Sequence, residues 1–216
     1  PDFKDLKDVA EILKVINGFE AASRLLVPDP NGVYMGEVNK VTYRTPDYML
    51  SSAQSFRPGE KGYQQHIWQA TLSPYAVVFT NNPDSLQVEG SHRPSYWMAN
   101  GRQPRTGQYE NLLIALYDIP RYPSAPKPLE MRHYAFTHAY FPKWAFDEVI
   151  EQDGWVFGRV DDGYVALYSD QPYQWITEGT DAGQEIVAPG YKNVWICQLG
   201  RESKDGSFAD FVAAVS

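Results

Sequence analysis

The stretch FGRVDDGYVALY, residues 157–168, decides the fold class. Its two halves are rich in β-branched and aromatic residues, and Asp162-Gly163 between them is the signature of a type I′ turn in a β-hairpin. Similar short runs, separated by turn residues, follow one another along the chain from Tyr34: KVTYRTPDYML, HIWQATL, YAVVFTN, NLLIALYDI, RHYAFTHAYF and NVWICQLG. Many short strands with turns between them predict a mainly β protein, built as a large antiparallel β-sandwich and not from βαβ units.

Helices are predicted only at the two ends of this β region. Residues 1–30 form a helical segment and linker, with apolar residues at three- and four-residue spacing up to Gly18 and the turn VPDPNG at its end. A C-terminal helix is predicted in DGSFADFVAAVS, where Ser207 can act as the N-cap. We therefore expect a helical segment over residues 1–30 and a β-sandwich domain over residues 31–216.

Charge and composition exclude several classes of partner. The chain has 27 acidic and 19 basic residues, a net charge of −8 and a pI near 5.0, so we expect no nucleic-acid partner. We also expect a soluble protein with no membrane partner, since no apolar run approaches the roughly 20 residues that span a bilayer. Cys197 is the only cysteine, which excludes a disulfide framework and a cysteine metal site. The compartment stays open, with a secreted or periplasmic location slightly favoured.

The sequence lacks the motifs of nucleotide, thiol-redox and zinc-protease chemistry: there is no P-loop, GxGxxG, CxxC, HExxH or GxSxG. We expect no cofactor and no metal. Aromatic residues make up 14% of the chain, and exposed aromatic rings can stack on sugars. On an acidic protein, this composition favours a polysaccharide or oligosaccharide as the ligand.

Two clusters combine hydrogen-bonding and cationic groups with aromatic rings. Residues 81–111 read as one long loop, and loops of this length in compact domains are commonly functional. Its arginines could form a fork for a substrate carboxylate. The candidate substrate-binding residues of the two clusters are Gln65, Trp68, His92, Tyr96, Trp97, Arg102 and Tyr109. For Tyr96 and Trp97 the alternative is a loop plug that covers one end of the core.

Histidines are the natural candidates for a catalytic base. His66 is predicted at the head of a strand beside Trp68, where a structural and a ligand-facing role are equally compatible with the pattern. His138 lies near a predicted strand end, which favours a site. His133 and His138 are five residues apart, so they fall on opposite faces of a strand and do not share a metal.

Several segments resemble the C-terminal β-sandwich region of heparinase II/III-like proteins. They are TYRTPDYMLSSAQSFRPGEKGYQQHIWQATL, YWMANGRQPR, NLLIALYDIP, DGWVFGRVDDGYVALYS and NVWICQLGRESKDGSFADFV, and the similarity covers most of the chain from about Val41. Members of that family join an N-terminal α/α toroid to a sandwich, and those of known activity are lyases of uronic-acid polymers. The resemblance implies catalytic roles for His66, Asn100 and Arg105, to which the pattern adds His138.

The resemblance also implies a partner for this chain. A toroid needs some hundreds of residues, so we expect the rest of the cleft to come from an N-terminal toroid domain or chain, and the chain alone to be an incomplete enzyme. Three functions then compete. The first is the sandwich part of a lyase that cleaves uronic-acid glycans. The second is a non-catalytic carbohydrate-binding or structural sandwich. The third is a glycoside hydrolase, which needs two convergent carboxyl groups.

Overall fold

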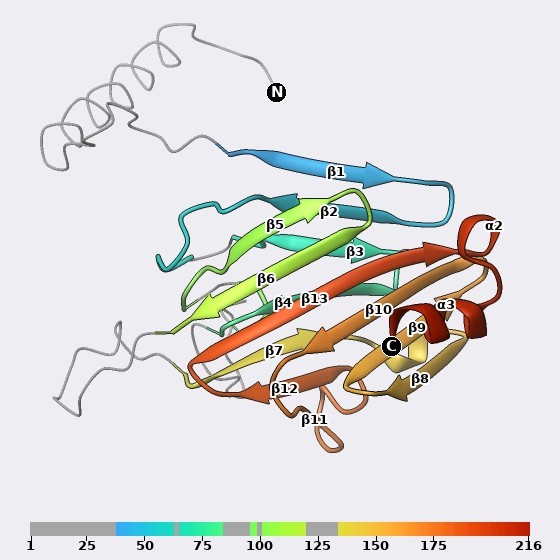
Figure 1. The fold of residues 1–216 in the computed structure, drawn as a ribbon. Helices are drawn as coiled ribbons and strands as arrows, with labels where there is room; N and C mark the ends of the chain where they lie inside the picture. Colours follow the sequence, from blue (N-terminus) through green and yellow to red (C-terminus); the bar gives the residue numbers. More distant parts are fainter. Residues whose placement is uncertain (1–37, 63–64, 84–95, 99–100, 120–133) are drawn as a thin grey trace, which may run out of the picture. The chain divides into compact units, whose positions relative to one another are not determined.

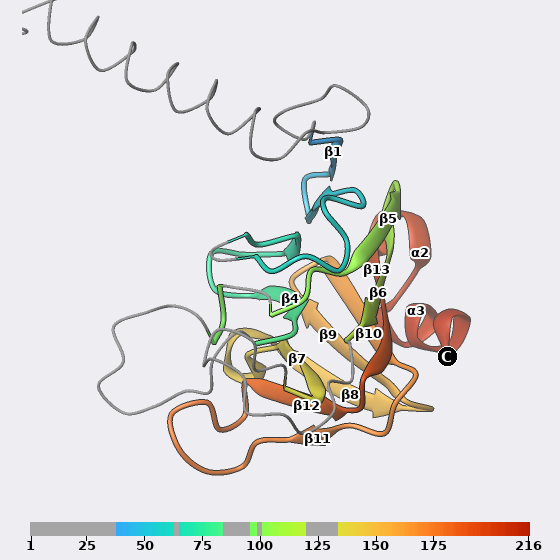
Figure 2. The same cartoon turned by 90° about the vertical axis from the view of Figure 1, so that its left-hand side faces the viewer.

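The computed structural model describes residues 38–62, 65–83, 96–98, 101–119 and 134–216. Residues 38–216 form one compact unit made of two antiparallel sheets that face each other (Figures 1 and 2). The predicted antiparallel β-sandwich is therefore confirmed. The predicted helical segment 1–30 lies outside the described residues.

The first sheet has seven strands. In the order β1-β2-β3-β4-β7-β12-β11 they are β1 (Lys40–Arg44), β2 (Met49–Ala53), β3 (Trp68–Thr71), β4 (Val77–Asn81), β7 (Phe136–Tyr140), β12 (Glu185–Pro189) and β11 (Gln174–Trp175). Strands β1 to β4 follow one another as a meander, so this part of the sheet is built from local hairpins.

The second sheet has six strands. In the order β5-β6-β13-β10-β9-β8 they are β5 (Arg105–Tyr109), β6 (Leu112–Asp118), β13 (Lys192–Arg201), β10 (Gly163–Ser169), β9 (Trp155–Val160) and β8 (Glu148–Gln152). The described part of the chain also contains three short helices: a 3₁₀ turn η2 (Lys143–Ala145), α2 (Glu202–Asp205) and α3 (Phe208–Val215).

The β9–β10 hairpin that the opening stretch predicts is present, but its turn lies one residue earlier. Val160 pairs with Gly163, so the two loop residues are Asp161 and Asp162. Only Asp161 of these two has a positive φ, at 49°. A type I′ turn needs positive φ at both loop residues, so the predicted turn type is wrong while the hairpin itself is confirmed.

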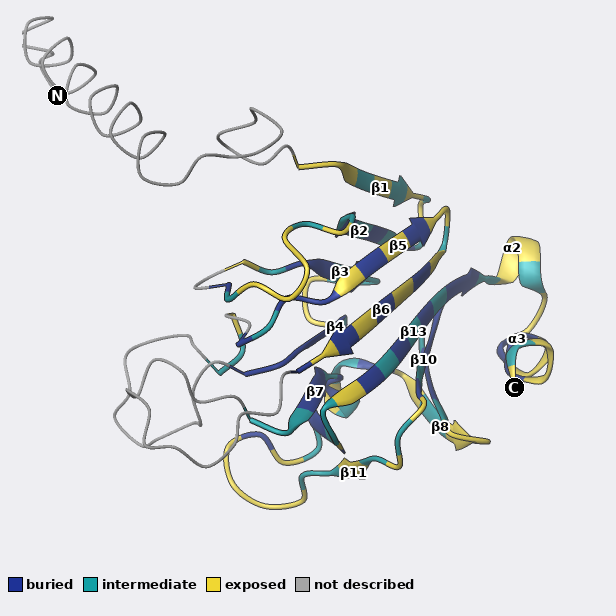
Figure 3. Cartoon of the chain, turned by 60° about the vertical axis from the view of Figure 1, so that its left-hand side comes forward, coloured by how far each residue is buried: buried dark blue, intermediate teal, exposed yellow. Residues whose placement is uncertain are grey.

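Strand alternation builds the core between the sheets. Along β6, buried Leu113, Ala115 and Tyr117 point inward, and the residues between them are exposed (Figure 3). Inward residues of both sheets form one apolar cluster that includes Leu50, Val78, Phe141, Ile186, Val165, Leu167, Trp195 and Leu199. Cys197 also lies in this cluster, fully buried, and burial raises the pKa of its thiol.

The indole N–H groups of two core tryptophans have hydrogen-bond partners inside the core. The Trp195 indole on β13 donates to Thr137 Oγ1 on β7 at 2.7 Å, which ties the two sheets together. The Trp68 indole donates to Thr80 Oγ1 at 2.9 Å, and Thr80 Oγ1 in turn lies 3.0 Å from the Tyr117 hydroxyl of the facing sheet. Trp68 and Trp195 are therefore buried with their indole N–H groups satisfied.

The C-terminal helix α3 packs on the outer face of the six-stranded sheet. Ser207 caps it through a capping box with Asp210, as the sequence predicts for Ser207. Its Phe208, Phe211 and Val212 bury a second, smaller cluster against residues of β9 and β10. The helix covers the outer face next to β9 and β10 (Figures 1 and 2), and its Phe211 ring also lies over Gly200 near the end of β13.

Strand glycines give a direct test of the core packing. A Cβ atom at Gly158 would lie 2.6 Å from the Phe146 ring and 2.9 Å from the Phe141 ring, whereas a Cβ atom at Gly107 in the same sheet meets nothing within 4 Å. We predict that Gly158→Ala lowers the free energy of unfolding by about 1–3 kcal/mol. Gly107→Ala is the matched control and should change it by less than about 0.5 kcal/mol. Urea unfolding measures both, and equal midpoints for the two variants would contradict the packing.

Candidate functional site

The outer face of the seven-stranded sheet carries most of the polar and aromatic groups of interest. Asn81 on β4 pairs in register with His138 on β7, and Tyr140 on β7 pairs with both Phe79 and Glu185. Paired residues of neighbouring strands share a face, and the residues that alternate with these ones, such as Ala139 and Ile186, point into the core. Asn81, His138, Tyr140, Phe79 and Glu185 therefore line the outer face together.

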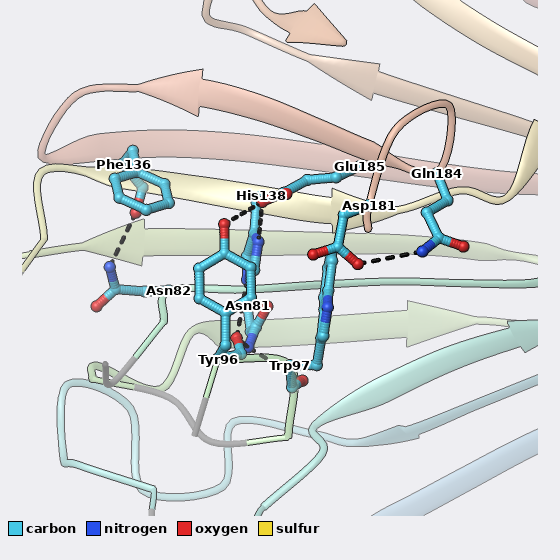
Figure 4. A network of polar contacts seen from close by, with 9 residues as sticks. All are labelled: Asn81, Asn82, Tyr96, Trp97, Phe136, His138, Asp181, Gln184 and Glu185. Atoms are coloured by element: carbon cyan, nitrogen blue, oxygen red, sulfur yellow. Dashed lines mark hydrogen bonds and ion pairs between the residues drawn. The ribbon is translucent and has the colours of Figure 1, made fainter. Parts of the chain in front are cut away.

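His138 is fully buried on this face, and both of its ring nitrogens have partners (Figure 4). Its Nε2 lies 3.1 Å from the Tyr96 carbonyl oxygen, and its Nδ1 lies 2.7 Å from Glu185 Oε1. A carbonyl oxygen only accepts, so Nε2 carries a proton and donates it. Nδ1 and Glu185 Oε1 form the second hydrogen bond, so both ring nitrogens of His138 are engaged in a buried polar pair with Glu185 and in a contact with the loop.

Tyr96 completes this pair from the loop side. Its hydroxyl donates to Glu185 Oε1, and the Asn81 amide donates to the carbonyl oxygens of Tyr96 and Trp97 at 3.0 and 3.1 Å. Burial, followed by the hydrogen bond to Glu185, raises the pKa of Tyr96 well above its ordinary value. Tyr96 therefore stays protonated as a donor, and residues 96–98 are anchored to the sheet by both side-chain and main-chain contacts.

Trp97 lies flat on His138. The two rings are 4.3 Å apart between centroids and inclined by only 8°. The indole therefore covers the imidazole, whose two nitrogens are already occupied. His138 is not placed to take a proton from a substrate in this arrangement, and its geometry fits a residue that positions Tyr96 and Trp97.

Aromatic rings connect this cluster to His66. Phe79 stacks on Tyr140 at 5.3 Å, meets Trp97 edge-on at 5.9 Å and meets His66 edge-on at 4.1 Å. The sequence places His66 in a strand, but β3 begins at Trp68, so His66 lies in the segment before the strand. Its ring packs on the outer face, so His66 does not point into the core of the sandwich.

His66 lines a pocket of about 380 Å³ on the β1–β3 side of the same sheet. The pocket is formed by Val38, Lys40, Met49, Ser51, Ser52, Ala53, His66, Ile67, Trp68 and Gln69. Its lining combines apolar groups with amide, hydroxyl and ammonium groups. Among the described residues, His66 Nε2 has no hydrogen-bond partner, and burial lowers the pKa of His66 to about 4. At neutral pH the lining of the pocket thus includes an uncharged imidazole and the ammonium group of Lys40.

An exposed aromatic pair lies near the other end of these strands, and the sequence analysis missed it. Tyr75 and Trp144 are 67% and 63% exposed, with ring centroids 5.9 Å apart. The Trp144 indole donates to Gln184 Oε1 at 3.3 Å, and Gln184 donates from Nε2 to buried Asp181 at 3.1 Å (Figure 4). Both rings sit in turns between strands, at Ser73–Tyr75 and in η2, and turn position is the one signal that could have pointed to them.

Other predicted site residues fall elsewhere. The predicted role of Trp68 in binding substrate stays a prediction: Trp68 lines the His66 pocket, but its side chain is a core residue, 1% exposed with its indole paired to Thr80. Alternate residues of β3 face the core, so the side chains of Trp68 and Ala70 both point inward. Arg105 and Tyr109 are exposed on β5, in register with Leu116 and Leu112 on the outer face of the six-stranded sheet. They are thus on the opposite side of the sandwich from His66 and His138.

The remaining candidates are close to His66 or outside the description. Gln65 is exposed beside His66, and Arg102 is half-buried. The residues on either side of Arg102 are held by main-chain hydrogen bonds. Gly101 N–H donates to Asn82 O, directly after β4, at 2.7 Å, and Gln103 N–H donates to Glu60 O at 2.8 Å. His92 and Asn100 lie outside the described residues. An arginine fork on this face therefore does not include Arg105.

Within residues 38–216, leaving out the segments not described, no three His, Cys, Asp or Glu side chains cluster as metal ligands. No helix in the described part of the chain is long and apolar enough to cross a bilayer.

Comparison with known proteins gives no relative from which to transfer a role: no family model, curated protein or solved structure matches this chain. The residues on the outer face therefore have to carry any functional argument themselves.

The pKa of His66 predicts how stability depends on pH. The unfolded chain binds a proton at His66 below about pH 6.5, but the folded chain does so only near pH 4. Stability should therefore fall as the pH drops through this window, by at most about 3 kcal/mol from this residue. Urea unfolding at several pH values between 4 and 7 should show that the free energy of unfolding depends less steeply on pH for His66→Gln than for the unmodified chain. An NMR titration in which the His66 ring protonates near pH 6.5 would contradict the assignment.

Proposed function

We propose that residues 38–216 are the glycan-binding sandwich of a carbohydrate-active protein, and that an acidic oligosaccharide lies along the outer face of the seven-stranded sheet. One observation carries this proposal: aromatic rings and hydrogen-bonding groups follow one another on a single face. They run from the His66 pocket, past Phe79, Trp97 and Tyr140, and toward the exposed pair Tyr75 and Trp144.

The chemistry of the face suits a sugar chain. Sugar rings combine apolar C–H faces, which pack on aromatic rings, with hydroxyl groups, which need hydrogen-bond partners. Tyr75 and Trp144 offer exposed rings, and Gln69 and Ser51 offer polar groups inside the pocket. Neighbouring strands are about 4.8 Å apart, so the distance from β3 across β4 and β7 to β12 is roughly 15 Å. That length suits an oligosaccharide better than a single ring.

Lys40 supports an acidic ligand. Its ammonium group is a positive charge on a chain of net charge −8, and it lines the same pocket as the uncharged imidazole of His66. A uronate carboxylate would find attraction there without a neighbouring carboxylate of the pocket lining to oppose it. The acidic residues of the His138 cluster are already engaged, since Glu185 bonds to His138 and Tyr96.

Binding of defined oligosaccharides tests the proposal. We predict that uronic-acid oligosaccharides bind the full 216-residue chain, and that Trp144→Ala weakens this binding by about tenfold or more because a stacking ring is lost. Lys40→Gln should weaken it by about threefold at low salt and leave neutral oligosaccharides unaffected. Isothermal titration calorimetry measures each dissociation constant.

Two matched controls lie on the other side of the sandwich. Tyr109 is 78% exposed on β5, so Tyr109→Ala removes an equally accessible ring, and Lys192→Gln on β13 removes an exposed lysine. Both variants should bind as the unmodified chain does. If Tyr109→Ala weakens binding as much as Trp144→Ala, the ligand does not lie on the proposed face.

A second candidate function is β-elimination of the bound uronate. The pocket holds two of the groups this reaction needs: Lys40 to stabilise negative charge on the carboxylate, and His66 as a neutral base for the proton α to it. A bound carboxylate beside His66 would raise the pKa of its ring and make it a stronger base. His138 is a poorer choice because Trp97 covers it. A glycoside hydrolase finds no such support, because no pair of free carboxyl groups lines the pocket.

Ultraviolet absorbance tests this second candidate. Each elimination leaves an unsaturated uronate at the new non-reducing end, so we expect absorbance to rise when the chain is incubated with a uronic-acid polymer. His66→Ala should reduce the rate by at least about 100-fold, whereas His66→Gln retains the size but not the basicity and should be equally slow. No product from any uronic-acid polymer would reject catalysis by this chain and leave glycan binding as its function.

A further inference from the structure

Strand β6 is apolar on both of its faces. Its sequence LLIALYD places Leu113, Ala115 and Tyr117 in the core, while Leu112, Ile114 and Leu116 point outward and are 37–42% exposed. A strand with apolar residues on both faces is typical of a sheet that is covered on both sides. The exposed half of β6 therefore indicates a surface that packs against something.

The apolar surface extends to the strands on both sides of β6. On β13, half-buried Val194 and Ile196 pair in register with Leu116 and Ile114. On β5, exposed Tyr109 pairs with Leu112. Helix α3 covers the same outer face over β9, β10 and the Gly200 end of β13, and leaves the rest of β13 open (Figures 1 and 3). We call the open part, formed by the outward residues of β5, β6 and β13, the β6 face.

Charges at the two ends of the β6 face are complementary. Arg105 is exposed at the start of β5, and Glu110 is exposed in the turn that follows its end. Lys192 lies 4.0 Å from Asp118 near the Arg105 end, so these two charges offset each other. The face as a whole is neutral, with a positive and a negative end, although the chain has a net charge of −8.

We propose that the β6 face binds the β6 face of a second copy of this chain. A two-fold axis perpendicular to the strands makes the strands of the two copies antiparallel. Arg105 then lies over Glu110 of the partner subunit, and the same contact repeats on the other side of the axis. An axis parallel to the strands would instead bring Arg105 toward its own equivalent, so charge selects the first arrangement.

The size of the face fits a reversible dimer. Strands of five to ten residues, three strands wide, give a surface roughly 20 Å long and 10–15 Å wide. Its flat area, roughly 200–300 Å² on each copy, is well below the about 800 Å² per partner of a standard interface, so the dimer is weak and forms only at high protein concentration. Two sheets packed face to face in this way keep their strands nearly aligned, as they do inside a sandwich. The dimer is independent of the proposed glycan function, because the two faces lie on opposite sides of the sandwich.

Sedimentation velocity over a range of concentrations tests the dimer. We expect the full chain to approach twice its mass of 24.5 kDa as its concentration rises. Ile114→Lys places a charge at the centre of the face and should raise the dimer dissociation constant by about 100-fold or more. Trp144→Lys, which changes an exposed aromatic residue in the η2 turn, away from β5, β6 and β13, should leave it unchanged. Circular dichroism checks that each variant is folded.

Charge reversal tests the arrangement of the two copies. Arg105→Glu and Glu110→Arg should each weaken the dimer, because each places like charges together, and the double variant should recover most of the lost affinity. A chain that stays monomeric at every concentration, or a dimer that Ile114→Lys does not weaken, overturns the proposal. If the double variant is no better than the single ones, the antiparallel arrangement is wrong.

Discussion

The packing of the two sheets depends on how the buried tryptophans find hydrogen-bond partners. Trp195 on β13 donates to Thr137 on β7, in the opposite sheet. Trp68 reaches Thr80, which also contacts the Tyr117 hydroxyl across the core. A buried N–H without a partner costs about 1–3 kcal/mol, so these contacts favour one relative placement of the sheets over nearby ones. That placement decides which residues of every strand face outward.

The outer face of the seven-stranded sheet has its own buried polar network. A buried polar pair is weak evidence of stability, since desolvation offsets much of the attraction. The pair His138 and Glu185 is better understood through its geometry, because it fixes the Tyr96 hydroxyl and main chain and thereby the Trp97 ring. A rigid aromatic surface loses little side-chain entropy when a ligand binds to it. The polar network therefore prepares the surface on which a sugar would lie.

Local patterns in the sequence predicted much of the fold but little of the site. Hairpins and the Ser207 cap are encoded by neighbouring residues, and both are present. Strand β5 was hidden inside a predicted loop because its inward residues, Thr106 and Gln108, are polar. Their side chains bond to β2, where Gln108 donates to Leu50 O and Thr106 donates to Ala53 O. Only the pairing of β5 with distant segments makes this strand recognisable.

The candidate site depends on how the strands of the two sheets pair in register, and no single stretch of the sequence specifies that pairing. Trp68 and His66 are two residues apart, yet one lies in the core and the other on the surface. Arg105 and His138 have the chemistry of one site but belong to different sheets. Tyr96, Trp97 and His138 were all predicted, but Glu185, the common partner of Tyr96 and His138, was not, because an acidic residue before a short apolar run reads as a turn.

The single cysteine has a consequence for how this fold can be observed. Cys197 lies at the centre of β13 between the sheets, fully buried, and burial raises the pKa of its thiol. A thiol reagent needs the exposed thiolate, so it can react only when the sandwich opens around β13. The chain thus contains its own reporter of core opening. Because no disulfide can form within the chain, the stability that this reporter measures does not depend on the redox state of the surroundings.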